Sequence, residues 1–169
     1  MKNIYLVGFM GTGKTTVGRV LAGKLNFKFV DLDDLIEGKE GIKIVDIFAK
    51  KGEAYFRDLE STALKETGGK EKLVVACGGG IVIRPGNVDF LEKNGLTVCL
   101  DAEPEAVYGR IRKSEHRPLL NVSNPKKEIE KLLNARKEFY NRIKRHIDTS
   151  SLTIEETADR IAEWVEDNY

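Results

Sequence analysis

The sequence is poor in cysteine and proline and contains no long apolar run. It has two cysteines and four prolines among 169 residues. Cys77 and Cys99 each lie in an apolar stretch, which favours inert buried thiols in a reducing compartment over a disulfide framework. No apolar run approaches the ~20 residues that cross a bilayer, and no targeting pattern is present at the N-terminus. We therefore expect a cytoplasmic protein with no membrane partner.

The sequence also lacks an excess of either charge. Lys and Arg number 28 while Asp and Glu number 27, so no net field would recruit nucleic acid. A chain of 169 residues, 41% of them hydrophobic, has the size and the apolar content of one domain with one core. We expect residues 1–169 to form a single domain that is monomeric and has no nucleic-acid partner.

Apolar runs alternate with segments of helical spacing along the chain. Strands are expected at 3–7, 27–30, 73–77, 97–100 and 145–148, and helices at 14–25, 32–38, 43–66, 88–93, 103–112, 125–143 and after a Thr153–Glu156 capping box. Continuous apolar strands are typical of a parallel sheet covered on both faces. The pattern therefore predicts an α/β fold with a central five-stranded parallel sheet.

A glycine-rich segment joins the first expected strand to the first expected helix. Residues 8–15 match G-x-x-x-x-G-K-[ST] at every fixed position. Glycines let successive backbone N–H groups turn toward phosphate oxygens, and the positive end of the following helix adds to the attraction. Lys14 is expected to reach the β and γ phosphates, and Thr15 to ligate Mg²⁺. This segment predicts a bound nucleoside triphosphate.

Nucleotide binding alone leaves switches, motors and kinases open. A GTP-dependent switch requires a D-x-x-G sensor and an N-K-x-D guanine element, and neither pattern occurs. An acidic Walker-B residue is also missing after the third expected strand, where Gly78, Gly79 and Gly80 follow. Three glycines in a row expose bare backbone to a ligand or another chain segment. The remaining polar residues must therefore decide the function.

Paired aspartates end the second expected strand. Asp31 and Asp33 lie at the carboxyl edge of the predicted parallel sheet, where ligands bind. One carboxylate can hold the metal while the other orients a substrate hydroxyl or accepts its proton. The alternative is that the aspartates cap the next helix, a role that Asp34 fits better than its neighbours.

Three arginines are candidates for binding an anion. Arg136 interrupts the apolar stripe of the expected helix at 125–143, so its guanidinium needs either a protein carboxylate or a substrate carboxylate. Arg57 is a second candidate for the same anion, although such a residue alone is more often a solvated helix charge. Arg117 lies in a polar segment at about 112–124, which we expect to form a mobile lid over the transferring phosphoryl group. The alternative for Arg117 is an exposed loop arginine.

Taken together, these segments resemble shikimate kinase. The resemblance rests on residues 8–16, 31–33, 55–57, 78–80, 117–120 and Arg136, in matching order and at matching separations over nearly the whole chain. It implies a three-layer P-loop kinase fold similar to that of nucleoside monophosphate kinases, with a substrate-binding helical region at about 32–66. It also implies that ATP, with Mg²⁺, phosphorylates the 3-hydroxyl of shikimate to give shikimate 3-phosphate in chorismate and aromatic amino acid biosynthesis.

The resemblance also implies roles for single residues. The implied catalytic residues are Lys14, Asp33 and Arg117, and the implied metal-binding residues are Thr15 and Asp31. The implied nucleotide-binding residues are Gly11, Thr12, Gly13, Lys14, Thr15, Thr16, Arg110 and Arg117, with Arg110 stacking on adenine and Arg112 close enough to replace it. The implied substrate-binding residues are Asp33, Arg57, Gly78, Gly79, Gly80 and Arg136, in which the two arginines clamp a carboxylate.

One departure from the family pattern concerns the adenine loop. Residues 148–153 lack the proline that some relatives carry there, so no single adenine contact is assigned in that loop. Gluconate kinase and nucleoside monophosphate kinases stay as alternatives, since gluconate also combines a carboxylate with hydroxyls. An alternative of another class is a nucleotide-binding module without catalysis, in which bound ATP would persist whatever acceptor is added.

Overall fold

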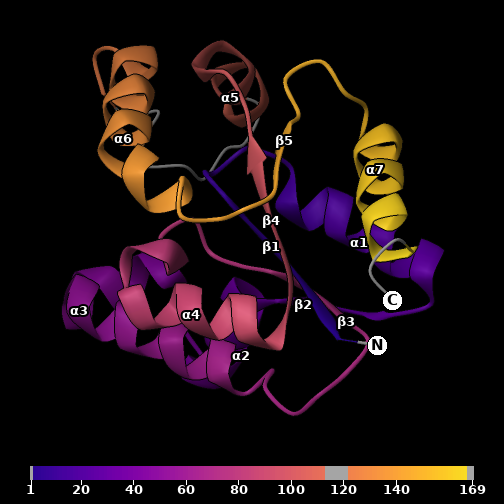
Figure 1. The fold of residues 1–169 in the computed structure, drawn as a ribbon. Helices are drawn as coiled ribbons and strands as arrows, with labels where there is room; N and C mark the ends of the chain where they lie inside the picture. The colour runs from indigo at the N-terminus through magenta and orange to yellow at the C-terminus, as the bar shows by residue number, and fades with distance from the viewer. Residues whose placement is uncertain (1, 113–121, 167–169) are drawn as a thin grey trace.

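The computed structural model describes residues 2–112 and 122–166, and five parallel strands form its centre (Figure 1). The strands are β1 (Asn3–Gly8), β2 (Lys28–Asp31), β3 (Leu73–Ala76), β4 (Gly95–Asp101) and β5 (His146–Asp148). Their order in the sheet is β2-β3-β1-β4-β5, and each neighbouring pair is parallel. The prediction of an α/β fold around a five-stranded parallel sheet is therefore confirmed.

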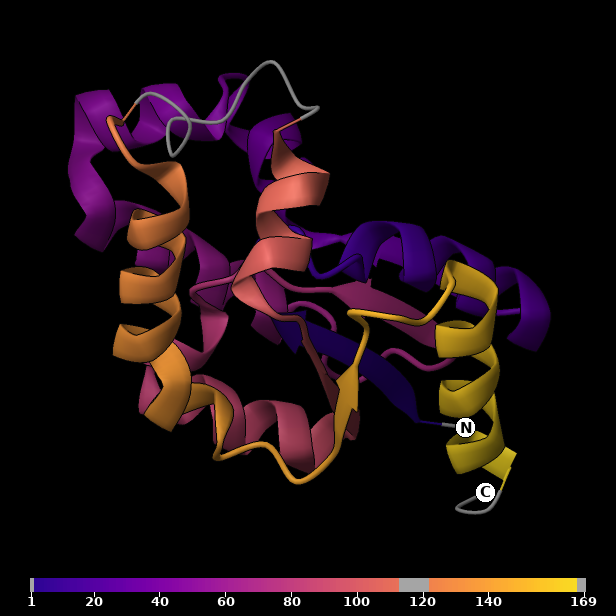
Figure 2. The same cartoon turned by 90° about the horizontal axis from the view of Figure 1, so that it is seen from above.

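Helices cover both faces of this sheet, giving three layers (Figures 1 and 2). The helices are α1 (Lys14–Leu25), α2 (Leu32–Glu40), α3 (Ile44–Lys65), α4 (Pro85–Asn94), α5 (Pro104–Ile111), α6 (Pro125–Tyr140) and α7 (Ile154–Glu166), with a short 3-10 turn η1 (Ile81–Ile83). Both views show α1 and α7 side by side on one face. In the described part of the chain, no helix has the length and apolar character that crossing a membrane requires.

Separate apolar clusters seal the two faces of the sheet. Ile4 and Leu6 of β1 pack with residues of α1 and α7. Tyr5 and Val7 pack with residues of α2, α3, α4 and α6. Successive strand residues point to opposite faces, so a strand covered on both faces must be apolar throughout. The polar residues that follow β1, β2 and β3 are left at the carboxyl edge of the sheet.

The helix ends follow local capping chemistry. Asn124 accepts a hydrogen bond from the backbone N–H of Lys127 at 3.1 Å, which fixes the start of α6. Thr153 and Glu156 exchange the two hydrogen bonds of the predicted capping box, at 2.8 and 3.1 Å. Both start signals were therefore read correctly from the sequence.

Two helix predictions differ from the structure. The helix expected at 43–66 is broken within α3 at Gly52, whose φ of 81° and ψ of 170° are not helical. The helix expected to reach about residue 143 ends at Tyr140, because the chain turns there and the N–H of Ile143 bonds the Tyr140 carbonyl at 2.9 Å. The apolar spacing of these segments continues past the backbone breaks, so periodicity alone overestimated both helices.

Candidate active site

The phosphate-binding segment connects β1 to α1. Gly13 precedes the helix with a φ of 99°, a conformation that favours glycine. A Cβ on Gly8 would lie 2.2 Å from the carbonyl oxygen of Leu100, so the chain also requires glycine there. Lys14 Nζ donates hydrogen bonds to the carbonyls of Gly8 and Phe9, each at 2.8 Å. Two carbonyl groups of the loop therefore fix the position of the Lys14 ammonium group.

This loop lines a cavity of about 690 Å³ at the carboxyl edge of the sheet. The cavity joins the loop to the end of β2, the glycine run after β3 and the segment between β5 and α7. Residues singled out by the sequence that line it are Gly11, Thr12, Gly13, Lys14, Thr15, Thr16, Asp31, Asp33, Gly78, Gly79 and Arg110. The fold thus brings the predicted phosphate-binding residues and the paired aspartates into one space.

Asp31 connects the loop to the end of β2. One carboxylate oxygen accepts the hydroxyl of Thr15 at 2.8 Å, and the other accepts the backbone N–H of Asp33 at 3.0 Å. Asp31 is thereby the N-cap of α2, whereas the sequence favoured Asp34 for that role. The helix begins at once after the strand, so the first aspartate is the one placed to cap it. A hydroxyl and a carboxylate are oxygen ligands of the kind that Mg²⁺ prefers, so Thr15 and Asp31 fit a magnesium site.

Asp33 reaches the same cavity from the first turn of α2. Its Oδ1 atom is buried and has no hydrogen-bond partner among the described residues. Burial, followed by the nearby carboxylates of Asp31 and Glu60, raises the pKa of Asp33 to about 6, while Lys14 lowers it. A carboxylate with this pKa can bind a hydroxyl and accept its proton near neutral pH.

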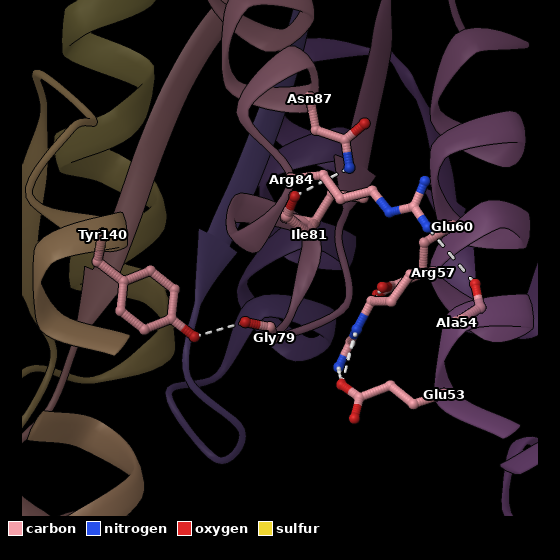
Figure 3. A network of polar contacts seen from close by, with 9 residues as sticks. All are labelled: Glu53, Ala54, Arg57, Glu60, Gly79, Ile81, Arg84, Asn87 and Tyr140. Atoms are coloured by element: carbon pink, nitrogen blue, oxygen red, sulfur yellow. Dashed lines mark hydrogen bonds and ion pairs between the residues drawn. The ribbon is translucent and has the colours of Figure 1, made fainter. Parts of the chain in front are cut away.

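A buried ion pair on α3 borders the glycine run (Figure 3). The guanidinium of Arg57 pairs with Glu53 and Glu60, and its side chain is only 12% exposed. Arg57 is therefore not a solvated helix charge. Glu60 is 1% exposed, and burial raises its pKa against the opposing effect of Arg57. A Cβ on Gly78 would lie 2.4 Å from Glu60 Oε1. Sequence reasoning missed Glu60, although its i, i+3 spacing from Arg57 was a usable signal.

The other two glycines of the run lie close to two arginines. A Cβ on Gly80 would lie 2.0 Å from Nη1 of Arg57, so a side chain there would displace the guanidinium. A Cβ on Gly79 would meet ordinary contacts at 3.6 to 3.7 Å, among them Nη1 of Arg136. The glycine run therefore lies between an arginine of α3 and an arginine of α6.

Arg136 projects from α6 toward the phosphate-binding loop. Its guanidinium lies 5.7 Å from the centre of the Phe9 ring. Across residues 2–112 and 122–166, no carboxylate forms an ion pair with Arg136. The first of the two partners considered from the sequence, a protein carboxylate, is therefore not found among these residues. Tyr140, one turn further along α6, donates a hydrogen bond to the Gly79 carbonyl at 2.6 Å (Figure 3). The sequence gave no signal for this contact.

Arg110 lies beside the phosphate-binding loop. Its guanidinium donates to the carbonyl of Gly11 at 3.2 Å and to the hydroxyl of Thr149 at 3.0 Å. These bonds place Arg110 beside the P-loop in the cavity and connect the loop to the residue that follows β5. Arg117 and most of the expected lid lie outside the described residues.

Both cysteines are free and buried, as the sequence predicts. Burial raises the pKa of each thiol above its ordinary value, which makes them poor nucleophiles. Cys99 also lies near Asp101 and His146. Asp101 Oδ2 is 2.6 Å from Nδ1 of His146, and the Cys99 thiol donates to Oδ1 at 3.4 Å. These two contacts explain why Cys99, Asp101 and His146 lie together, and no bound metal ion is needed to explain it.

The fold and the cavity together define the class of protein. A P-loop that opens the first helix of a parallel sheet shares one cavity with a buried carboxylate, and two arginines flank the adjoining glycine run. This combination is typical of a P-loop phosphotransferase with a small-molecule acceptor. The chain is therefore assigned to that class.

Comparisons with known proteins identify the family. Residues 10–166 match the family model described as shikimate kinase. The shikimate kinase of Thermodesulfovibrio yellowstonii is 46% identical over 161 residues, which are 95% of this chain and 93% of the relative. The shikimate kinase of Pelotomaculum thermopropionicum is 41% identical over 170 residues, covering 100% and 99%. The chain belongs to the shikimate kinase family.

Solved structures agree with this assignment. The shikimate kinase from Acinetobacter baumannii in complex with shikimate superposes with a TM-score of 0.92 at 39% identity, covering 99% of this chain and 94% of that chain. The shikimate kinase from Aquifex aeolicus gives a TM-score of 0.85 at 37% identity, covering 98% and 97%. The family resemblance stated from the sequence motifs is therefore confirmed.

Proposed function

We propose that the protein transfers the γ-phosphoryl group of ATP to the 3-hydroxyl of shikimate, giving shikimate 3-phosphate and ADP in aromatic amino acid biosynthesis. The observation that carries this proposal, beside the family membership, is the buried and unpartnered Oδ1 of Asp33 in the cavity of the P-loop. A hydroxyl group can satisfy that oxygen, whereas an apolar ligand cannot.

The donor side is proposed to bind ATP through backbone and cation contacts. Amides of the loop and Lys14 would hold the phosphates, and Arg110 would flank the adenine. Thr15 and Asp31 would hold Mg²⁺, which would supply positive charge that neutralises the phosphates. The proposed nucleotide-binding residues are Gly11, Thr12, Gly13, Lys14, Thr15, Thr16 and Arg110, with Arg117 from the segment outside the described residues.

The acceptor side is proposed to bind the carboxylate and hydroxyls of shikimate separately. Arg57 and Arg136 would hold the carboxylate, and their placement on either side of Gly79 and Gly80 supports this. Asp33 would hold the hydroxyls. Together with Gly78, these residues form the proposed substrate site, and the helices at about 32–66 contribute its walls.

The chemistry proposed for Asp33 follows from its pKa of about 6. Above that pH its carboxylate accepts a hydrogen bond from the acceptor hydroxyl and takes its proton as the new P–O bond forms. The bond between the γ-phosphorus and the bridging oxygen breaks, and ADP leaves with the electron pair. Lys14 balances the charge that develops, and Arg117 on a closing lid at about 112–124 is proposed to assist it.

A coupled ADP-release assay tests this proposal. The enzyme is given Mg²⁺ and ATP with shikimate, gluconate, AMP or no acceptor. We expect ADP formation with shikimate only, and its loss in Asp33→Asn. Activity with gluconate or AMP instead would keep the phosphotransferase class and refute the acceptor. ATP that persists with every acceptor would favour a binding module without catalysis.

A further inference from the structure

A single hydrogen bond connects the end of α6 to the glycine run. Tyr140 is buried at 5% exposure, and its hydroxyl donates to the carbonyl of Gly79 at 2.6 Å (Figure 3). Burial raises the pKa of Tyr140 to about 12, although the neighbouring Arg136 opposes the shift. The hydroxyl therefore keeps its proton throughout the working pH range and acts as a donor to this carbonyl.

The bond orients more than one atom of the glycine run. A peptide unit is planar, and in its trans form the C=O and N–H groups point in opposite directions. No cis peptide occurs among the described residues. Fixing the Gly79 carbonyl toward α6 therefore directs the N–H of Gly80 away from α6.

The Gly79–Gly80 peptide borders the cavity of the P-loop, which Gly79 lines. Gly80 is buried, and its N–H donates to no backbone carbonyl in the described part of the chain. A buried unpaired amide costs about 1–3 kcal/mol, so a chain tolerates one where a ligand or water completes it. The guanidinium of Arg57 packs against the same residue. The peptide held by Tyr140 thus lies next to a group that we propose to bind the acceptor carboxylate.

The second arginine proposed for the acceptor lies beside the same peptide. Arg136 lies one turn before Tyr140 on α6, and a Cβ on Gly79 would lie 3.7 Å from its Nη1 atom. The Tyr140 hydroxyl therefore holds a peptide that borders the guanidinium of Arg136. Fixing this peptide restricts it to one arrangement beside the guanidinium before any ligand arrives.

We propose that Tyr140 is a positioning residue of the acceptor site. Its hydroxyl holds the Gly79–Gly80 peptide, beside the guanidinium of Arg136, in the arrangement that receives the acceptor. Tyr140 touches neither reacting atom in this account. The inference rests on the proposed function, because the acceptor is taken to be shikimate.

Tyr140→Phe tests this role, and Tyr5→Phe is the matched control. Tyr5 is also buried, its hydroxyl is 2.9 Å from that of Thr67, and it is not among the residues that line the cavity. We expect Tyr140→Phe to raise the KM for shikimate about tenfold, as the loss of one buried hydrogen bond in a binding site allows, and to leave the KM for ATP within about twofold. Tyr5→Phe should lower the melting temperature without changing either KM.

Several outcomes separate this inference from its alternatives. An unchanged KM for shikimate in Tyr140→Phe would refute the positioning role. Equal rises in both KM values would show a general loosening of the cavity and refute it too. Tyr140→Met also removes the hydroxyl and should raise the KM for shikimate in the same way. Thermal unfolding of every variant shows whether each is folded, so the test does not depend on one protein. Wild-type enzyme that is inactive with shikimate would instead refute the proposed function.

Discussion

The proposed donor side of the cavity and the proposed acceptor side next to it are built in different ways. The donor side comes mainly from residues 8–16, one continuous segment whose shape is set by glycine backbone conformations and hydrogen bonds within the loop. The proposed acceptor side takes Asp33 from α2, Arg57 from α3, the glycine run after β3 and Arg136 from α6. Asp33, Gly78 and Gly79 line the cavity, whereas Arg57, Gly80 and Arg136 are not among its lining residues. The side chains of the proposed acceptor side meet only when α2, α3 and α6 are packed on one face of the sheet.

Substitutions on the two sides should therefore have different effects on binding and on stability. A backbone loop positions phosphates through amides that most side-chain substitutions leave intact. The acceptor side depends on charged groups that are partly or fully buried, among them Glu60 at 1% exposure. Removing one buried partner leaves the other uncompensated, so acceptor-side substitutions should affect both binding and stability.

The largest expected effect is that of Asp33→Asn. The amide cannot take the acceptor proton, so we expect kcat to fall by about 10²- to 10⁴-fold. The P-loop is untouched, so the dissociation constant for ATP should stay within about threefold, as calorimetry can measure. Turnover at the normal rate in this variant would remove Asp33 from the mechanism.

Replacing Gly80 or Gly79 by alanine should have different effects. Gly80→Ala should lower stability, and Gly79→Ala should weaken the binding of shikimate. The Cβ in Gly80→Ala would lie 2.0 Å from Nη1 of Arg57. The displaced guanidinium would leave buried Glu60 without its ion pair, and we expect a loss of about 1–3 kcal/mol in unfolding free energy. Gly79→Ala meets only ordinary contacts, so it should keep wild-type stability and bind shikimate more weakly. Equal thermal stability of the two variants would contradict this view of the glycine run.

The pH dependence of activity should report Asp33. Its pKa of about 6 lies well above the ordinary value for aspartate, and only the carboxylate can take the proton of the acceptor. We therefore expect kcat/KM for shikimate to fall about tenfold per pH unit below pH 6 and to level off above it. The residual activity of Asp33→Asn should lack this acidic limb. A profile that is flat down to pH 5 would show that no group with this pKa acts in the reaction.

The last expected effect concerns stability alone. Because the folded pKa of Asp33 is raised from 3.8 to about 6, ionising it costs the folded chain more than the unfolded chain. The resulting destabilisation is small at pH 4, grows between pH 4 and pH 6 and is complete above pH 6. Asp33→Asn should therefore exceed wild type in unfolding free energy at pH 8 by on the order of 3 kcal/mol. The two proteins should be nearly equally stable at pH 4, and chemical denaturation at both pH values measures this.

The donor side could be predicted from the sequence because its chemistry is local. Residues 8–15 carry the whole motif, and the apolar strands around it fix the sheet. The strands alternate with helices along the chain, so the five-stranded parallel sheet also followed from pattern. Three local features were not predicted: the break in α3 at Gly52, the end of α6 at Tyr140 and the role of Asp31 as N-cap of α2.

The acceptor side could be predicted only in part. Arg136 was noticed because it interrupts an apolar stripe, and Asp33 because it ends a strand. Glu60 was missed although its i, i+3 spacing from Arg57 offered a local signal. Tyr140 went unnoticed because its partner, the Gly79 carbonyl, comes next to it only in the folded chain. A tyrosine in an apolar stripe looks like any core residue until the carbonyl that it bonds is known.

The most direct test of the account is the pair of KM values in Arg136→Ala. Loss of a charged hydrogen bond to the acceptor carboxylate should raise the KM for shikimate on the order of 10²-fold, because such interactions are worth about 2–5 kcal/mol. The KM for ATP should stay within about twofold of the wild-type value, since the proposed donor side comes mainly from residues 8–16 and not from α6. Equal rises in both KM values would contradict the division of the cavity into a donor side and an acceptor side.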